Sequence, residues 1–91
     1  RLMILKDKII LVTGGCGLIG KELVADINRK GGKAINADIS VETNLQIGTL
    51  KLDITDDHSI QNGIDKIISE FGRIDGLVNN AYPRTKDWGT K

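Results

Sequence analysis

The chain has 91 residues, of which 40% are hydrophobic and 27% charged, and its formal net charge is only +1. These values are typical of one small globular domain, and they exclude a strongly basic nucleic-acid-binding surface. The longest apolar run, Ile9 to Val12, is far shorter than the roughly 20 residues that cross a bilayer, so we expect no membrane partner. The single cysteine, Cys16, fits a reducing compartment, and we expect a cytoplasmic protein.

The first half of the chain predicts two strands around one helix. Lys8 to Thr13 is a continuous apolar run, typical of a strand buried on both faces of a parallel sheet. Apolar residues then recur at helical spacing, and the glycine pair at 31 and 32 predicts the end of that helix: they are Leu18, Ile19, Leu23, Val24 and Ile27. A second strand is predicted over Lys33 to Ala37, ending at Asp38, and a polar loop over Ser40 to Ile47.

The second half repeats this alternation. Gly48 to Leu52 predicts a third strand that ends at Asp53, and Ile74 to Asn79 predicts a fourth. Between them, Thr55, Asp56 or Asp57 can cap a helix that Gly72 ends, with one buried face formed by Ile60, Ile64, Ile67, Ile68 and Phe71. The pattern predicts an α/β fold, a partial Rossmann-like doubly wound parallel sheet with four strands in the order 3-2-1-4.

A glycine-rich loop, VTGGCGLIGKE at residues 12 to 22, lies between the first strand and the first helix. Gly15, Gly17 and Gly20 form the pattern G-x-G-x-x-G. A glycine at the turn reaches backbone angles closed to other residues, a missing Cβ lets the chain approach a pyrophosphate, and the third glycine lets helix and strand pack tightly. The helix N-terminus offers free N–H groups and partial positive charge, so the loop predicts a dinucleotide site.

An acidic residue follows at the distance this pattern requires. Asp38 lies eighteen residues after Gly20, at the end of the second predicted strand. Its carboxylate would accept hydrogen bonds from both hydroxyls of the adenosine ribose and repel a 2′-phosphate, which favours NAD over NADP. The structural alternative is that Asp38 only caps a loop.

Lys21 keeps a different class of protein open. Gly15, Gly20 and Lys21 also satisfy the first seven positions of the P-loop of nucleoside triphosphatases. The eighth position holds Glu22, where a hydroxyl should bind Mg²⁺, so this alternative fits less well. A noncatalytic nucleotide-binding module is a further alternative.

With Thr13 and Gly14, the text TGGCGLIG resembles the signature of the short-chain dehydrogenase/reductase family, in its T-G-x-x-G-x-x-G spacing. The text LDITD, residues 52 to 56, resembles the family's motif after the third strand. That likeness implies that Asp53 contacts the adenine amino group and that Ile54 lines the adenine pocket. The text NNA, residues 79 to 81, resembles the N-N-A-G motif beside the cofactor ribose, although Tyr82 replaces its glycine. NNAYPR is also similar to family members from flagellin-modification or surface-sugar pathways.

The loop and the resemblance together give one candidate cofactor-binding set: Gly14, Gly15, Cys16, Gly17, Leu18, Ile19, Gly20, Asp38, Asp53, Ile54, Asn79, Asn80 and Ala81. The resemblance implies an NAD(P)-dependent oxidoreductase that transfers hydride between nicotinamide and an alcohol or carbonyl substrate. The family's catalytic serine and Tyr-x-x-x-Lys pair lie in the second half of its chains. We therefore expect residues 1–91 to be the N-terminal, dinucleotide-binding half of one Rossmann domain, with no catalytic residue and no activity alone.

Three further expectations complete the interpretation. Tyr82 and Lys86 imitate the catalytic spacing, but Pro83 disfavours the helix that such a pair needs. His58, the only histidine, has no second ligand at metal-binding spacing, so we expect no metal site. The fourth strand would be an edge with its apolar Leu77 and Val78 facing water, so we expect either a homo-oligomer or coverage of this edge by the rest of a longer enzyme.

Overall fold

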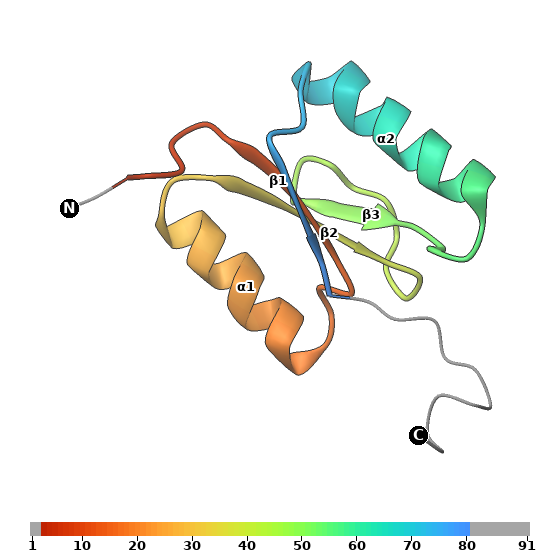
Figure 1. The fold of residues 1–91 in the computed structure, drawn as a ribbon, viewed down its shortest axis with the longest axis horizontal. Helices are drawn as coiled ribbons and strands as arrows, with labels where there is room; N and C mark the ends of the chain where they lie inside the picture. The colour runs from red at the N-terminus through yellow and green to blue at the C-terminus, as the bar shows by residue number, and fades with distance from the viewer. Residues whose placement is uncertain (1–2, 81–91) are drawn as a thin grey trace.

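A computed structural model of the chain describes residues 3–80. Within this range strands and helices alternate, with the bounds β1 Ile9–Thr13, α1 Leu18–Arg29, β2 Lys33–Asp38, β3 Thr49–Lys51, α2 Asp57–Phe71 and β4 Gly76–Asn79. The four strands form one sheet in the order β3-β2-β1-β4, and every neighbouring pair is parallel (Figure 1). The predicted α/β fold and its strand order are confirmed.

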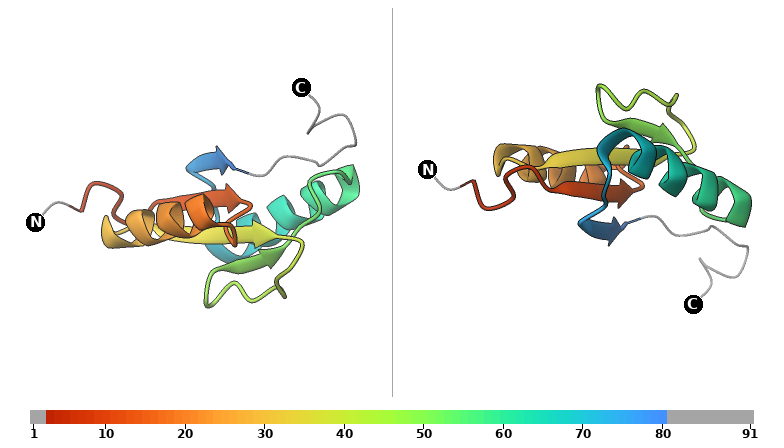
Figure 2. Two further views of the ribbon diagram at one scale, coloured as in Figure 1. Left: turned by 90° about the horizontal axis from the view of Figure 1, so that it is seen from below. Right: turned by 90° about the horizontal axis from the view of Figure 1, so that it is seen from above.

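The two helices cover opposite faces of the sheet: α1 lies in front of the strands in one view of Figure 2, and α2 lies in front of them in the other. On the α1 face, Ile27 packs with Val12 and Ala34. On the α2 face, Ile67 is fully buried in a larger cluster with Ile9, Leu11, Ile35, Ala37, Leu50 and Leu52. β1 and β2 are therefore buried from both sides, which is why their sequences read as apolar runs rather than as an alternating pattern.

β1 is one residue shorter than predicted, and β3 and β4 are each two residues shorter, for local reasons. β3 begins after Gly48, whose φ of +88° breaks the extended backbone. β4 begins at Gly76 rather than Ile74, because Asp75 turns toward β1: its carboxylate accepts a hydrogen bond from the N–H of Ile9 (2.8 Å), and its own N–H donates to the Ile9 carbonyl (2.8 Å). Ile74 still packs against the core below α2.

The helix signals are confirmed at the ends and only partly along the faces. Asp56 is the N-cap of α2, and Gly72 ends that helix in the left-handed conformation. Ile68, predicted on the buried face, is 44% exposed, because it lies about 100° round the helix from the fully buried Ile67. Leu18 is 86% exposed at the first turn of α1, beyond the reach of the core.

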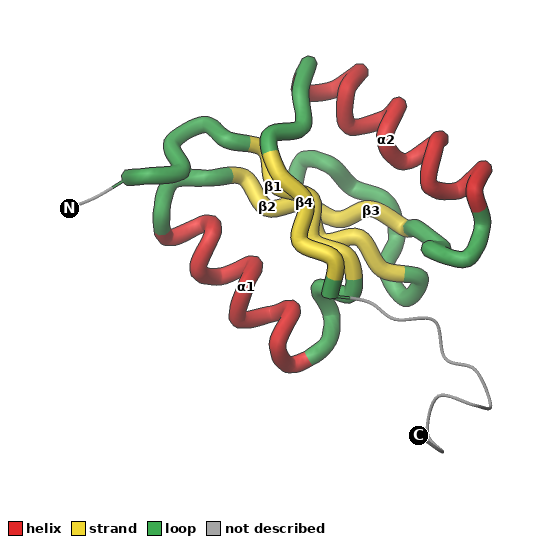
Figure 3. The backbone as a smooth tube through the Cα atoms, in the orientation of Figure 1, coloured by secondary structure: helices red, strands yellow, loops and turns green. Residues whose placement is uncertain are grey.

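The carboxyl ends of the parallel strands meet at one edge of the sheet, where the chain leaves β1 for α1 (Figure 3). This edge carries the glycine loop, the end of β2 and the residues that follow β3. Ligands of open α/β sheets bind outside the carboxyl ends of the strands. The fold therefore brings the predicted site residues to the place where such a fold binds ligands.

Candidate functional site

The glycine loop turns at Gly14, which has a φ of +71°. Its N–H donates to the Ala37 carbonyl (2.8 Å), and its carbonyl accepts the N–H of Gly17 (3.2 Å). Gly15 and Gly17 have no positive φ, so the conformational freedom expected of the G-x-G-x-x-G pattern is needed one residue before it. The T-G pair that begins the loop is what sets its turn.

Gly15 and Gly20 are needed for space instead. A Cβ at position 20 would lie 2.3 Å from the Gly14 carbonyl oxygen and 2.6 Å from the Gly15 Cα, both backbone atoms. A Cβ at position 15 would lie 2.1 Å from the side-chain oxygen of Asn36. Helix α1 and the loop are thus pressed against each other and against β2, as the third glycine of the pattern predicts.

The N-terminus of α1 is left without a side-chain cap. Gly17 is its N-cap residue, no side chain hydrogen-bonds to the cap, and no acidic residue occurs in the first turn. Ile19, in that turn, is 67% exposed. The partial positive charge of the helix is therefore open toward the glycine loop, which is the arrangement that binds phosphate groups.

Asp38 lies at the end of β2, against this loop. Its Oδ1 accepts the N–H (3.0 Å) and the hydroxyl (2.8 Å) of Ser40, and its Oδ2 accepts the N–H of Cys16 (3.4 Å). Burial alone would raise the pKa of this carboxyl, but the hydrogen bonds from Ser40 and Cys16 outweigh it and lower the pKa below its ordinary value. Asp38 does cap a turn, as the structural alternative supposed, and it is ionised at neutral pH.

A pocket of about 160 Å³ lies beside Asp38. It is lined by Gly14, Ala37, Asp38, Ile39, Leu52, Asp53 and Ile54, so the ends of three strands contribute to it. Pockets that enclose a whole drug-sized ligand have roughly 300 Å³ or more. This one has the size for one end of a longer molecule whose other groups lie along the loop.

Asp53 forms the far wall of this pocket. Its Oδ1 accepts the hydroxyl (2.6 Å) and the N–H (2.9 Å) of Thr55, and the hydroxyl bond contributes most to lowering the pKa of this carboxyl. Asp38 and Asp53 thus place two carboxylates around one small pocket. A negatively charged pocket lining attracts hydrogen-bond donors, such as hydroxyls and amines, and repels phosphate groups.

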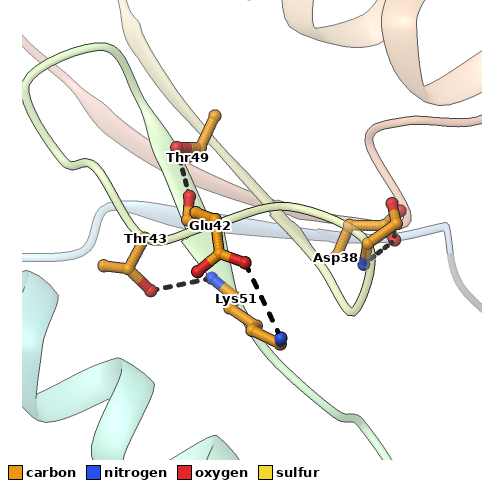
Figure 4. Close-up of polar contacts among 6 residues, drawn as sticks. Asp38, Glu42, Thr43, Thr49 and Lys51 are labelled. Carbon is orange, nitrogen blue, oxygen red and sulfur yellow. Dashed lines mark hydrogen bonds and ion pairs between the residues drawn. The ribbon is translucent and has the colours of Figure 1, made fainter.

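The loop that follows Asp38 is fastened to β3 (Figure 4). The Thr49 hydroxyl donates to the Glu42 carbonyl (2.8 Å), the Lys51 N–H donates to the Thr43 hydroxyl (3.0 Å), and Lys51 and Glu42 form an ion pair at 3.9 Å. These bonds hold the loop against β3 four and five residues after Asp38.

The end of β4 is tied to the glycine loop through Thr13. The Thr13 hydroxyl donates to Asn79 Oδ1 (2.8 Å) and accepts the N–H of Asn80 (3.1 Å), while the Asn80 side-chain amide donates to the Gly14 carbonyl (3.2 Å). Asn79 and Asn80 therefore fasten the loop from the side opposite Asp38. Ala81 lies outside the described residues, as do Tyr82, Lys86 and the end of the NNAYPR stretch.

Sequence reasoning missed several residues of the site. Ala37, Ile39 and Leu52 line the pocket, and each is next to a predicted site residue at a strand end, which was the available signal. Asn36 contacts Gly15 in the loop, but an amide side chain within an otherwise apolar strand does not predict such a contact. Lys21 and Glu22 are exposed on α1, and the part of the chain that the structure describes has no cluster of metal-ligating side chains.

A family model described as short chain dehydrogenase matches residues 8–86. The chain belongs to the short chain dehydrogenase family. The match covers every element described above, so neither the P-loop alternative nor a noncatalytic module is favoured. No helix among residues 3–80 has the length and apolarity that crossing a membrane requires.

The chain is also similar to individual proteins in sequence and in structure. A post-translational flagellin modification protein A of Campylobacter coli is 41% identical over 97 residues, covering 93% of this chain and 38% of the relative. A sorbitol-6-phosphate 2-dehydrogenase of Klebsiella pneumoniae is 38% identical over 87 residues, covering 88% and 33%. The ligand-free aldohexose dehydrogenase of Thermoplasma acidophilum superposes with a TM-score of 0.81 at 29% identity, covering 93% and 33%. The chain thus spans about a third of the length of these relatives.

Proposed function

We propose that this chain is the NAD-binding part of an oxidoreductase that transfers hydride between a nicotinamide and an alcohol or carbonyl substrate. The observation that carries the proposal is the pocket in which the glycine loop, Asp38 and Asp53 meet. Relatives named as dehydrogenases of sorbitol-6-phosphate and of aldohexose support the reaction type. We assign these residues to the N-terminal half of a single Rossmann domain.

Each chemical group of a dinucleotide has residues in this chain that suit it. The N-terminus of α1, which Gly15, Cys16 and Gly17 lead into, suits a pyrophosphate, because no side chain caps the helix there. Gly20 permits the close approach of helix and loop. The pocket suits the adenosine, with Asp38 toward the ribose hydroxyls, Asp53 toward the adenine amine and Ile54 against its ring. We assign Leu18, Ile19, Asn79 and Asn80 to the side of the nicotinamide half, and we assign Ala81, which lies outside the described residues, from the sequence resemblance alone.

Asp38 favours NAD over NADP in this proposal. Its pKa is lowered, so the carboxylate is charged and would repel a 2′-phosphate. The bond from the Cys16 N–H holds Oδ2 toward the loop. The two residues that follow Asp38, Ile39 and Ser40, carry no positive charge that could accept the extra phosphate.

A bound nicotinamide would supply the hydride donor or acceptor, and this chain's own residues bind and orient it. We assign no catalytic residue to residues 1–91. Leu77 on β4 is 62% exposed, which supports a contact of this strand with a second copy of the protein, and the single Cys16 supports a cytoplasmic protein. The substrate would be a small molecule, not a nucleic acid or a membrane.

Calorimetric titration of the protein as its gene encodes it, with NAD⁺, NADP⁺ and Mg-ATP in turn, tests the proposal. We expect NAD⁺ to bind most tightly. Asp38→Ser should weaken NAD⁺ binding by about 10- to 100-fold, because charged hydrogen bonds to the ribose are lost.

The matched control is Asp65→Ser, which removes an exposed carboxylate of α2 and should leave NAD⁺ binding unchanged. Binding of Mg-ATP alone would refute the proposal and favour the P-loop alternative. Binding of NAD⁺ without oxidation of any alcohol or reduction of any carbonyl by the natural protein would favour a noncatalytic module.

A further inference from the structure

Asn36 is a polar residue at a position where the fold calls for an apolar one. It lies in the middle of β2, on the face that carries Ala34 and Asp38, because side chains two apart share a face of a strand. Its partner in the register with β1 is the fully buried Val12. Its side-chain oxygen is buried and has no hydrogen-bond partner among residues 3–80. An unsatisfied buried amide oxygen in a strand lowers stability, so a contact of this side chain should account for its presence.

That contact is with the glycine loop. The Asn36 amide nitrogen donates to the Cys16 sulfur (3.6 Å), and the amide oxygen and carbon occupy the space that a Cβ of Gly15 would need, at 2.1 and 2.5 Å. The Asn36 side chain therefore fills the space between β2 and the loop at Gly15 and Cys16. Since Gly15 has no positive φ, Asn36 rather than the backbone conformation makes glycine necessary there.

The same strand holds Cys16 at a second point. Two residues after Asn36, Asp38 accepts the N–H of Cys16 through Oδ2 (3.4 Å). Cys16 is thus attached to β2 by its side chain at Asn36 and by its backbone at Asp38. A shift of the loop away from Asn36 would also move this N–H away from the carboxylate that faces the pocket.

We propose that Asn36 is a positioning residue for dinucleotide binding: through Gly15 and Cys16, its amide sets the height of the glycine loop above β2. This inference rests on the proposed function. Asn36 does not line the pocket and acts only through the two loop residues. It predicts that binding and stability respond in opposite directions when the amide is removed.

The test is Asn36→Val in the natural protein, because valine suits a strand and leaves no unpartnered oxygen. We expect a melting temperature equal to or above that of the unsubstituted protein and NAD⁺ binding weaker by about three- to tenfold. Substitution of a residue with only a structural role would lower the melting temperature and the affinity for NAD⁺ together. Unchanged NAD⁺ affinity, or a loss of affinity that only follows a loss of stability, would overturn the proposal.

The matched control is Asn28→Ala. Asn28 also joins α1 to β2 by a side-chain amide, whose oxygen accepts the N–H of Ala34 (3.1 Å), but at the far end of the helix from the loop. This variant should lower the melting temperature and leave the affinity for NAD⁺ unchanged. A loss of affinity like that of Asn36→Val would overturn the assignment, because any link between helix and strand would then have the same effect.

A second measurement does not need the ligand, so it separates this inference from the proposed function. Gly15→Ala should lower the melting temperature of the ligand-free protein, and it should lower it less when Asn36→Ala is also present, because the atoms that collide are gone. An equal loss in both backgrounds would overturn the role of Asn36. If no dinucleotide binds the unsubstituted protein, the proposed function fails while this cycle still decides whether Asn36 sets the loop.

Discussion

The N-termini of the two helices are built in opposite ways. At α2, the Asp56 carboxylate accepts the N–H groups of His58 (2.9 Å) and Ser59 (3.4 Å), and Asp57 adds a second negative charge in the first turn. At α1, the N-cap is a glycine without a side-chain acceptor, and no acidic residue follows in the first turn. The same backbone dipole is neutralised by the chain at α2 and left open at α1.

This difference separates a structural helix end from a binding one. A glycine N-cap costs roughly a few tenths of a kcal/mol relative to Asp or Ser, and the missing acidic charge of the first turn about 0.3–1 kcal/mol more, so α1 forgoes stability that α2 has. In return its N–H groups are available to a ligand anion. The glycine loop is therefore the part of the molecule where local stability and the proposed function conflict.

The largest expected difference is between substitutions of the buried glycines of the two helices, Gly20 in α1 and Gly63 in α2. Gly20→Ala places a methyl group against backbone atoms of the loop, which cannot rotate away, so we expect a loss of about 3 kcal/mol in the free energy of unfolding and no measurable NAD⁺ binding. Gly63→Ala in α2 meets only the ends of the Leu52 and Leu50 side chains, at 2.8 and 3.1 Å. Better helix propensity offsets that contact, so its net effect should stay within about 1 kcal/mol.

Urea unfolding and calorimetric titration of both variants measure this contrast. Equal losses of stability at the two glycines would mean that the loop backbone is able to yield, and the close packing of α1 would not be what requires Gly20.

Gly17→Asp would make the N-terminus of α1 resemble that of α2. Position 17 has an extended backbone and room for a Cβ, whose nearest atom would be the Gly14 carbonyl oxygen at 3.6 Å. The new carboxylate should raise the free energy of unfolding by about 0.5–1 kcal/mol and weaken NAD⁺ binding at least about tenfold, because it competes with the pyrophosphate.

Gly17→Ser is the matched control, since it adds a neutral cap of smaller size. It should stabilise α1 to a similar degree with a smaller loss of affinity. If Gly17→Asp left NAD⁺ binding intact, the uncapped helix end would not be the phosphate site.

Removing the cap of α2 tests the other side of the comparison. Asp56→Ala should lower the free energy of unfolding by about 1 kcal/mol, because two N–H groups lose their acceptor. The affinity for NAD⁺ should not change, as Asp56 is not among the residues of the pocket. A fall in affinity measured by titration at a temperature where the variant is folded would contradict the division of roles.

The smallest effect is the acid dependence of stability through Asp38. Its pKa in the folded protein is below the ordinary value of 3.8, so the charged form favours folding. Its contribution is fully present above pH 3.8 and is lost as the pH falls through the lowered pKa. The stability difference between the protein and Asp38→Asn should therefore be constant from neutral pH to about pH 5 and shrink below that, in urea unfolding at stepwise lower pH. A difference that grew toward acid pH would mean that the pKa is raised.

Local signals in the sequence were sufficient for the fold and for four of the seven residues that line the pocket. Apolar runs marked β1 and β2, Asp56 and Gly72 marked the ends of α2, and the alternation of strands and helices implied a parallel sheet in the order 3-2-1-4. The glycine spacing and Asp38 marked the edge of the sheet that holds the pocket. These features depend on neighbours in the chain or on general rules of chain connection, which is why a sequence determines them.

Tertiary structure alone decided which atoms of distant segments meet. That the positive φ falls on Gly14, that Asn36 fills the space beside Gly15, and that Cys16 is tied to Asp38 all depend on how the loop lies across β2. Contacts between segments about twenty residues apart leave no periodic trace in a single sequence, because each depends on the three-dimensional path of both segments.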